Sequence, residues 1–266
     1  MSSSIDTLFE RTRSENRAAL VGYLPSGFPT KELSIKAIEA MVEGGVDLVE
    51  VGLPYSDPVM DGPVIQAAAE QALRAGARTS DVFDVVAASA ATGAPTVVMT
   101  YWNPVEKYGV ERFSADLAGA GGSGLITPDL IPDEADEWIT ASQANNLDRI
   151  FLVAPSSTDK RLAMTVDAAS GFVYATAVMG VTGARDTTSS LGEQLVARVK
   201  EVTAKPVGVG LGVSNGAQAH EIAAYADAVI VGSALVRCLL DASSESAGLD
   251  AIRALARDLR AGVERT

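Results

Sequence analysis

Hydrophobic residues in this chain fall into short apolar runs that alternate with longer amphipathic stretches from one end to the other. Runs of this length and composition are typical of buried strands in a parallel sheet. The pattern predicts eight strands, at residues 18–24, 46–52, 95–101, 123–127, 148–154, 171–176, 206–210 and 228–232.

The amphipathic stretches between these runs are typical of helices that pack one face against a core. We predict a helix before the first strand, at 5–16, and a short helix that begins at Ser233. The longer ones are expected at 33–43, 65–73, 80–91, 132–144, 191–202, 217–225 and 249–259. Strand centres lie roughly 20–35 residues apart, the spacing of successive strand–helix units.

Eight such units predict a closed, parallel (β/α)8 barrel, the TIM-barrel fold, with an extra N-terminal helix. No linker or low-complexity tract divides the sequence, so we expect a single domain spanning residues 1–266. The alternative is an open doubly wound sheet, which usually carries a glycine-rich dinucleotide fingerprint after its first strand. Here Pro25-Ser-Gly-Phe-Pro29 follows the first strand instead, and this favours the barrel.

Composition narrows the classes of partner and site. The net charge of −13 argues against nucleic acid and anionic membranes, so any bound phosphate is expected on backbone amides. The single cysteine, Cys238, excludes an internal disulfide, and with one histidine, His220, there is no zinc set. We therefore expect no metal in this protein. We also expect it to be cytoplasmic, because neither a signal peptide nor a membrane-spanning run is evident.

Acidic residues suggest a proton-transfer site at the end of the second strand. Glu50 lies inside a predicted buried strand, where a carboxylate is costly unless it is paired or used. Asp61 follows in a proline-rich loop, and two carboxylates in different environments can divide acid and base roles. The alternatives are a structural pairing for Glu50 and a helix N-cap for Asp61. We interpret Asp57 as a turn residue.

Glycine-bearing segments follow the last three strands, where this fold commonly binds phosphate. They lie at 179–184, 208–213 and 231–234, and glycine lets backbone amides approach an anion. The alternative is that these glycines only form tight turns. Tyr101 and Tyr174 end strands three and six, where they either pack at the rim or face a ligand. No lysine lies within a strand, which disfavours Schiff-base aldolase chemistry.

The motifs are Glu50-Val-Gly-Leu-Pro-Tyr-Ser-Asp-Pro58, Asp61-Gly-Pro63, Gly180-Val-Thr-Gly183, Gly210-Leu-Gly212 and Val231-Gly-Ser233. Together they resemble the tryptophan synthase alpha subunit family over essentially the whole chain. The resemblance implies a lyase of tryptophan biosynthesis that cleaves indole-3-glycerol phosphate to indole and glyceraldehyde 3-phosphate. It implies no cofactor in this chain, and a partner beta subunit that carries pyridoxal phosphate in an α2β2 complex.

The resemblance also implies roles for individual residues. Glu50 is then the general acid and base, and Asp61 accepts the indole N–H. Tyr174 matches a site tyrosine, and the phosphate cradle matches Gly183, Gly212, Gly232 and Ser233. We further expect the substrate to contact Tyr23, Ile65, Tyr101, Thr182 and Leu211, with Thr182 bonding Asp61 when its loop closes.

Two positions depart from the family pattern. Val178 stands where an arginine is frequent, and Asp129 lies in a proline-rich loop, Thr127-Pro-Asp-Leu-Ile-Pro132. We expect loops 54–61 and 179–190 to meet the partner at the barrel mouth. The alternatives are a self-sufficient indole-releasing lyase, a non-catalytic activating subunit and, more remotely, a phospho-sugar isomerase.

Overall fold

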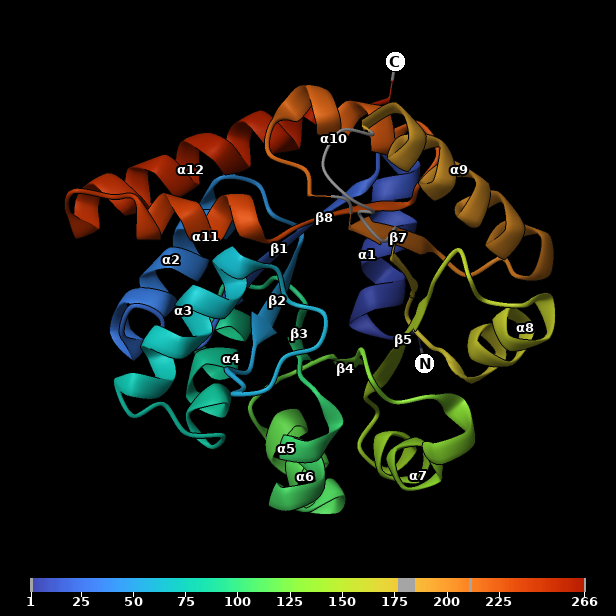
Figure 1. Ribbon diagram of the computed structural model, residues 1–266, viewed down its shortest axis with the longest axis horizontal. Coiled ribbons are helices and arrows are strands. Elements are labelled where there is room, and N and C mark those ends of the chain that lie inside the picture. Colours follow the sequence, from blue (N-terminus) through green and yellow to red (C-terminus); the bar gives the residue numbers. More distant parts are fainter. Residues whose placement is uncertain (1, 177–184, 211, 266) are drawn as a thin grey trace.

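Eight parallel strands close into a barrel in the part of the chain that the computed structural model describes, residues 2–176, 185–210 and 212–265. They follow one another in chain order around the ring, and β1 pairs with β8 to close it. This confirms the (β/α)8 barrel and the eight predicted strands (Figure 1). The strands are β1 (Ala19–Pro25), β2 (Leu48–Gly52), β3 (Thr96–Met99), β4 (Gly124–Thr127), β5 (Asp148–Val153), β6 (Val173–Thr176), β7 (Val207–Gly210) and β8 (Ala228–Val231).

Helices surround this barrel, and every predicted helix has a counterpart. None of the described helices is long and apolar enough to cross a membrane. The helices are α1 (Ser4–Ser14), α2 (Lys31–Glu43), α3 (Pro63–Arg74), α4 (Asp81–Ala91), α5 (Trp102–Tyr108), α6 (Val110–Gly119), α7 (Asp136–Ala144), α8 (Asp159–Ala168), α9 (Arg185–Val202), α10 (Gly216–Ala223), α11 (Ser233–Leu240) and α12 (Glu245–Gly262).

Several helix boundaries differ from the sequence-based expectation. The segment 132–144 divides into a 3-10 turn, Pro132–Glu134, and then α7, with Ala135 between them. Helix α9 begins at Arg185, so the prediction that residues 185–190 belong to a loop was wrong.

Three helices were not predicted at all. Helix α5 is only seven residues long and contains Pro104, and α6 starts beside Gly109, whose φ is 96°. The proline and the glycine interrupt the helical pattern in this part of the sequence. Helix α8 had a local signal, because the hydroxyl of Thr158 caps it by accepting from the Arg161 N–H at 3.3 Å.

The barrel interior is filled by one cluster of apolar side chains, and α1 covers its N-terminal end. Ile5, Leu8 and Phe9 of α1 pack with inward residues such as Val21 and Leu48. A capping box between Ser3 and Asp6 starts this helix. Figure 1 shows α1 near the middle of the ring. Because the N-terminal end is closed, the inward-facing positions at the opposite end form the open mouth.

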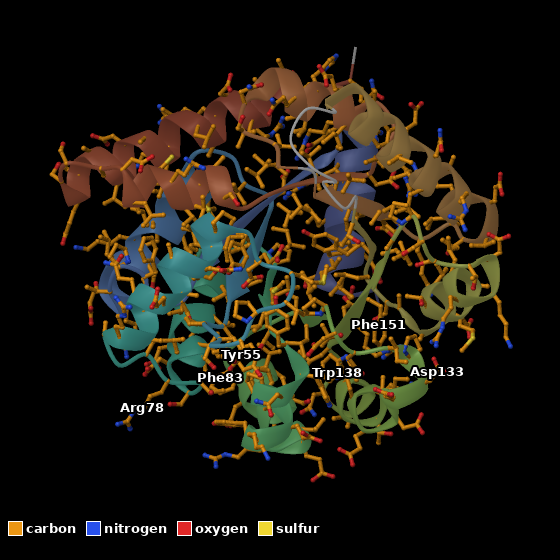
Figure 2. The ribbon with its side chains drawn as sticks, in the orientation of Figure 1. Tyr55, Arg78, Phe83, Asp133, Trp138 and Phe151 are labelled. Atoms are coloured by element: carbon orange, nitrogen blue, oxygen red, sulfur yellow. The ribbon has the colours of Figure 1, made fainter. Side chains whose placement is uncertain are left out.

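A second apolar layer lies between the strands and the surrounding helices. Its largest side chains include Trp138 of α7 and Phe151 of β5, both fully buried. Figure 2 shows them in the lower part of the view, where α7 covers the sheet. This layer holds the strands in register, and so it fixes where the strand ends point.

Candidate active site

Glu50 lies in β2, where its side chain continues the inward-facing series that begins with Leu48. The residue is 3% exposed, and its Oε2 atom has no hydrogen-bond partner among the described residues. Burial, and to a lesser extent the charge of Asp61, raise the pKa of Glu50 to about 8. The structural-pairing alternative is therefore not supported by the described residues, and the raised pKa favours the protonated form of Glu50 at neutral pH.

Asp61 belongs to the loop between β2 and α3. Its carboxylate accepts a hydrogen bond from the Tyr101 hydroxyl at 3.1 Å, and its carbonyl accepts one from Gln66 Nε2 at 2.7 Å. Burial raises the pKa of Asp61, whereas the hydrogen bond from Tyr101 lowers it. The N-cap of α3 is Gly62, followed by Pro63. The N-cap interpretation of Asp61 was thus wrong, and its side chain is directed to the site.

Two tyrosines stand near both carboxylates. Burial raises the pKa of Tyr23 and of Tyr174 well above the ordinary value, and the charges of Asp61 and Glu50 add to the effect. Each ring packs against a glycine on the neighbouring strand. A Cβ on Gly52 would collide with the Tyr23 ring, and one on Gly210 would lie 2.6 Å from the Tyr174 hydroxyl. Sequence reasoning missed Gly52, although its position two residues after Glu50 on the same face was a usable signal.

The structure also brings predicted phosphate-cradle residues to this end of the barrel. Gly212 is exposed and has a φ of 67°, a conformation that favours glycine. Gly232 is the N-cap of α11, and Ser233 is the first residue of that helix. A Cβ on Gly232 would lie within 3.4–3.6 Å of Tyr23 and Ile65. Ile65, Tyr23 and Gly232 therefore meet, as expected for one pocket.

Four predictions fall on residues outside the part of the chain that the structure describes. They concern Thr182, Gly183, Leu211 and Val178. Asp129, by contrast, has a described role, because its Oδ1 atom accepts a hydrogen bond from the Trp102 N–H at 2.8 Å. This carboxylate satisfies one of the free amides at the start of α5, so its role within the chain is structural.

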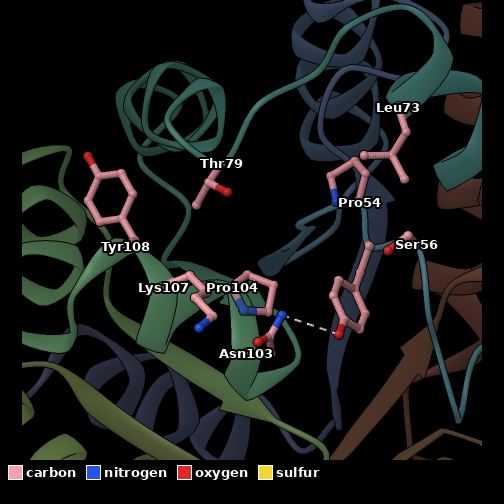
Figure 3. Close-up of a pocket in the computed structure, with 9 residues that line it drawn as sticks. Pro54, Ser56, Leu73, Thr79, Asn103, Pro104, Lys107 and Tyr108 are labelled. Carbon is pink, nitrogen blue, oxygen red and sulfur yellow. Dashed lines mark hydrogen bonds between the residues drawn. The ribbon is translucent and has the colours of Figure 1, made fainter.

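A hollow of about 340 Å³ lies outside the barrel mouth, between the loop after β2 and α5. Figure 3 shows its lining, including the hydrogen bond from Asn103 to the Tyr55 hydroxyl at 3.4 Å. Lys107 and Tyr108 line its α5 side. Glu50 and Asp61 are not among its lining residues, so the hollow is separate from the carboxylate site.

Comparison with known proteins decides the family. The family model described as tryptophan synthase alpha chain matches residues 9–264. The chain belongs to the tryptophan synthase alpha chain family. Members from Salinispora arenicola and Acidothermus cellulolyticus are 64% and 59% identical over 98% and 99% of this chain, and the matches cover 98% of each relative. A structure of Mycobacterium tuberculosis tryptophan synthase superposes with a TM-score of 0.93 at 56% identity, covering 100% of both chains.

Membership of the tryptophan synthase alpha chain family establishes the reaction. The chain is a lyase that cleaves indole-3-glycerol phosphate to indole and glyceraldehyde 3-phosphate in tryptophan biosynthesis. The family name also implies a partner beta subunit. The phospho-sugar isomerase alternative is thereby excluded.

Proposed function

We propose that Glu50 is the general acid and base of this lyase and that Asp61 stabilises the charge that develops on the indole ring. The observation that supports this best is the Glu50 carboxyl, which is buried at the barrel mouth with an unpartnered Oε2 and a pKa of about 8. Such a group holds a proton near neutral pH, and efficient acid–base catalysts have pKa values close to the working pH.

The reaction then proceeds in two proton transfers. Protonated Glu50 donates its proton to the indole ring carbon that bears the glycerol phosphate chain, and the ring becomes a cation. Asp61 accepts the hydrogen bond of the indole N–H and stabilises that cation. The ionised Glu50 next takes the proton of the side-chain hydroxyl. As that hydroxyl becomes an aldehyde, the carbon–carbon bond breaks and its electrons restore the indole ring.

The surrounding residues provide the walls and the anion site in this proposal. Tyr23, Tyr174 and Ile65 supply the apolar surface that an indole ring requires. The phosphate binds to backbone N–H groups near Gly212, Gly232 and Ser233, where the start of α11 adds a favourable dipole. Tyr101 contacts the site through Asp61. The roles of Thr182, Gly183 and Leu211 rest on the resemblance to the family.

The barrel mouth is also the proposed docking face for a beta subunit in an α2β2 complex. Large apolar side chains are exposed there: Val59 is 78% exposed, Met60 48% and Ile131 39%. Val59 and Met60 belong to the loop after β2, which carries Asp61, and Ile131 belongs to the loop after β4. Exposed apolar patches beside a site support partner binding. The chain would act as one domain, 1–266, in the cytoplasm without its own cofactor, while the partner carries pyridoxal phosphate.

The experiment that tests this proposal is an assay of indole release from indole-3-glycerol phosphate, with and without the beta subunit. We expect slow release by the isolated chain and a clear acceleration when the partner is added. Rapid turnover that the partner does not change would instead support a self-sufficient lyase. No indole release in either condition, combined with stimulation of the partner, would support a purely activating subunit.

A further inference from the structure

Tyr101 occupies the junction between β3 and the loop that carries Asp61. It is 3% exposed and directly precedes α5. Its hydroxyl donates to Asp61 Oδ1 at 3.1 Å and accepts from the Met60 N–H at 3.0 Å. A phenol can donate and accept at once, so one oxygen contacts both the carboxylate and the backbone beside it. A phenylalanine could do neither.

We infer that Tyr101 is a positioning residue, which holds the Asp61 carboxylate at the mouth and ties its loop to the barrel wall. Among the described residues, the one hydrogen bond that this carboxylate accepts comes from Tyr101. The loop itself offers little support, because Val59 and Met60 point largely into solvent. Without the tyrosine, Asp61 would have to be ordered by the substrate, at an entropic cost.

The tyrosine is itself held firmly. Its ring packs against that of Tyr55, with centroids 5.2 Å apart and planes inclined by 32°. The next residue, Trp102, is anchored through its N–H by Asp129 from the following loop, at 2.8 Å. The hydroxyl therefore has a fixed location, as a group that orients a catalytic carboxylate requires.

Removing the hydroxyl should change the ionisation of Asp61. Besides Tyr101, the titratable groups near Asp61 among the described residues are Glu50, Tyr23 and Tyr174. The hydrogen bond favours ionised Asp61, so its loss raises the pKa of Asp61. The bell-shaped pH dependence of kcat should therefore narrow from its acid side.

The test is a double-mutant cycle in the enzyme with its beta subunit, and it rests on the proposed role of Asp61. Tyr101→Phe should lower kcat roughly 10- to 100-fold, the range for losing a hydrogen bond to a charged group, with a smaller change in KM. In an Asp61→Asn background the same substitution should cost little more. The acid limb of the pH profile should move upward in Tyr101→Phe.

Controls make the outcomes distinguishable. Tyr108→Phe removes another hydroxyl that donates to a carboxylate, that of Asp116 at 2.6 Å, away from the mouth. It should leave kcat and the pH profile unchanged. Replacing Tyr101 with 3-fluorotyrosine keeps the shape but strengthens donation, and should move the acid limb downward.

Additive effects in the cycle, or an acid limb that stays in place, would overturn the inference about Tyr101. Normal turnover in Asp61→Asn alone would instead overturn the proposed role of Asp61. If Tyr101→Phe does not fold, the fluorotyrosine enzyme decides, since an unmoved acid limb there contradicts the inference.

Discussion

Two buried carboxylates lie three residues apart, Asp47 just before β2 and Glu50 within it, and their surroundings differ. Asp47, next to the closed end of the barrel, accepts hydrogen bonds from Arg17 at 2.6 and 2.8 Å, from Arg11 at 3.1 Å and from the Leu20 N–H at 2.9 Å. Glu50, at the open mouth, has an Oε2 atom without a partner among the described residues. Both residues are under 10% exposed.

The contrast shows how one strand serves both stability and chemistry. At the closed end the charge of Asp47 is neutralised by the buried Arg17, so removing either one deprives the other of its buried partner. At the mouth no described residue offsets the burial of Glu50, and its raised pKa favours the protonated form instead. A site that must bind and release protons cannot satisfy its carboxyl as fully as a structural pair does.

The largest expected effect is on turnover at the mouth. Glu50→Gln removes the transferable proton but keeps the size of the side chain. We expect kcat for indole formation to fall at least ~100-fold, because general acid–base catalysis contributes typically ~10²–10⁴-fold. Steady-state assays with the beta subunit measure this. A variant with near-normal kcat would assign the proton transfer to another group.

The next effect concerns stability at the closed end. Asp47→Asn should lower the free energy of unfolding by about 3 kcal/mol, because buried Arg17 loses its buried countercharge and keeps only the more exposed Glu15. Asp159→Asn is the matched control, since its ion pair with Arg198 is exposed and should matter by less than about 1 kcal/mol. Denaturant unfolding gives both values. Equal losses in the two variants would remove the distinction between the ends.

A smaller effect is the pH dependence of the free energy of unfolding that Glu50 causes. The pKa of Glu50 is raised in the folded state. Its burial therefore lowers the free energy of unfolding progressively as pH rises from about 4.5 to about 8. Glu50→Gln should therefore be neutral near pH 4.5 and stabilising by on the order of 2–3 kcal/mol near pH 7. Urea unfolding at both pH values checks this. The prediction is contradicted if Glu50→Gln does not raise the free energy of unfolding above that of the parent at pH 7.

The smallest expected effect concerns phosphate binding. Gly212→Val places a branched side chain on a backbone with a φ of 67° and should block approach to the amides. We expect substrate and free glycerol phosphate to weaken in parallel, by roughly tenfold or more. Calorimetric titration of glycerol phosphate measures the change. Unaltered binding of both would mean that the phosphate lies elsewhere.

Much of the fold could be predicted from the sequence because its signals are local and repeated. Eight apolar runs of strand length and the amphipathic stretches between them specify a barrel. Among the unpredicted helices, α5 has seven residues and contains Pro104, α6 follows directly after Gly109, and α8 had a capping signal at Thr158 that was not used. The start of α9 at Arg185 lies in a polar stretch, 185–190, that lacks an apolar stripe.

The candidate site was partly predictable for a different reason. Strand ends of a parallel barrel meet at one mouth, so Glu50 and Tyr174 could be placed there from their positions alone. The link between Tyr101 and Asp61 joins residues 40 apart and depends on how a loop folds back. The fit of Tyr23 against Gly52 depends on packing between neighbouring strands. No local pattern encodes either contact.

The protonation state of Glu50 is the most direct test of the difference between Glu50 and Asp47. Infrared difference spectroscopy of the protein with ¹³C-labelled glutamate, with Glu50→Gln as the reference, isolates its carboxyl signal. We expect a protonated carboxyl at neutral pH that ionises with a midpoint near 8. A Glu50 carboxylate already ionised at about pH 6, as an exposed glutamate would be, would contradict the account.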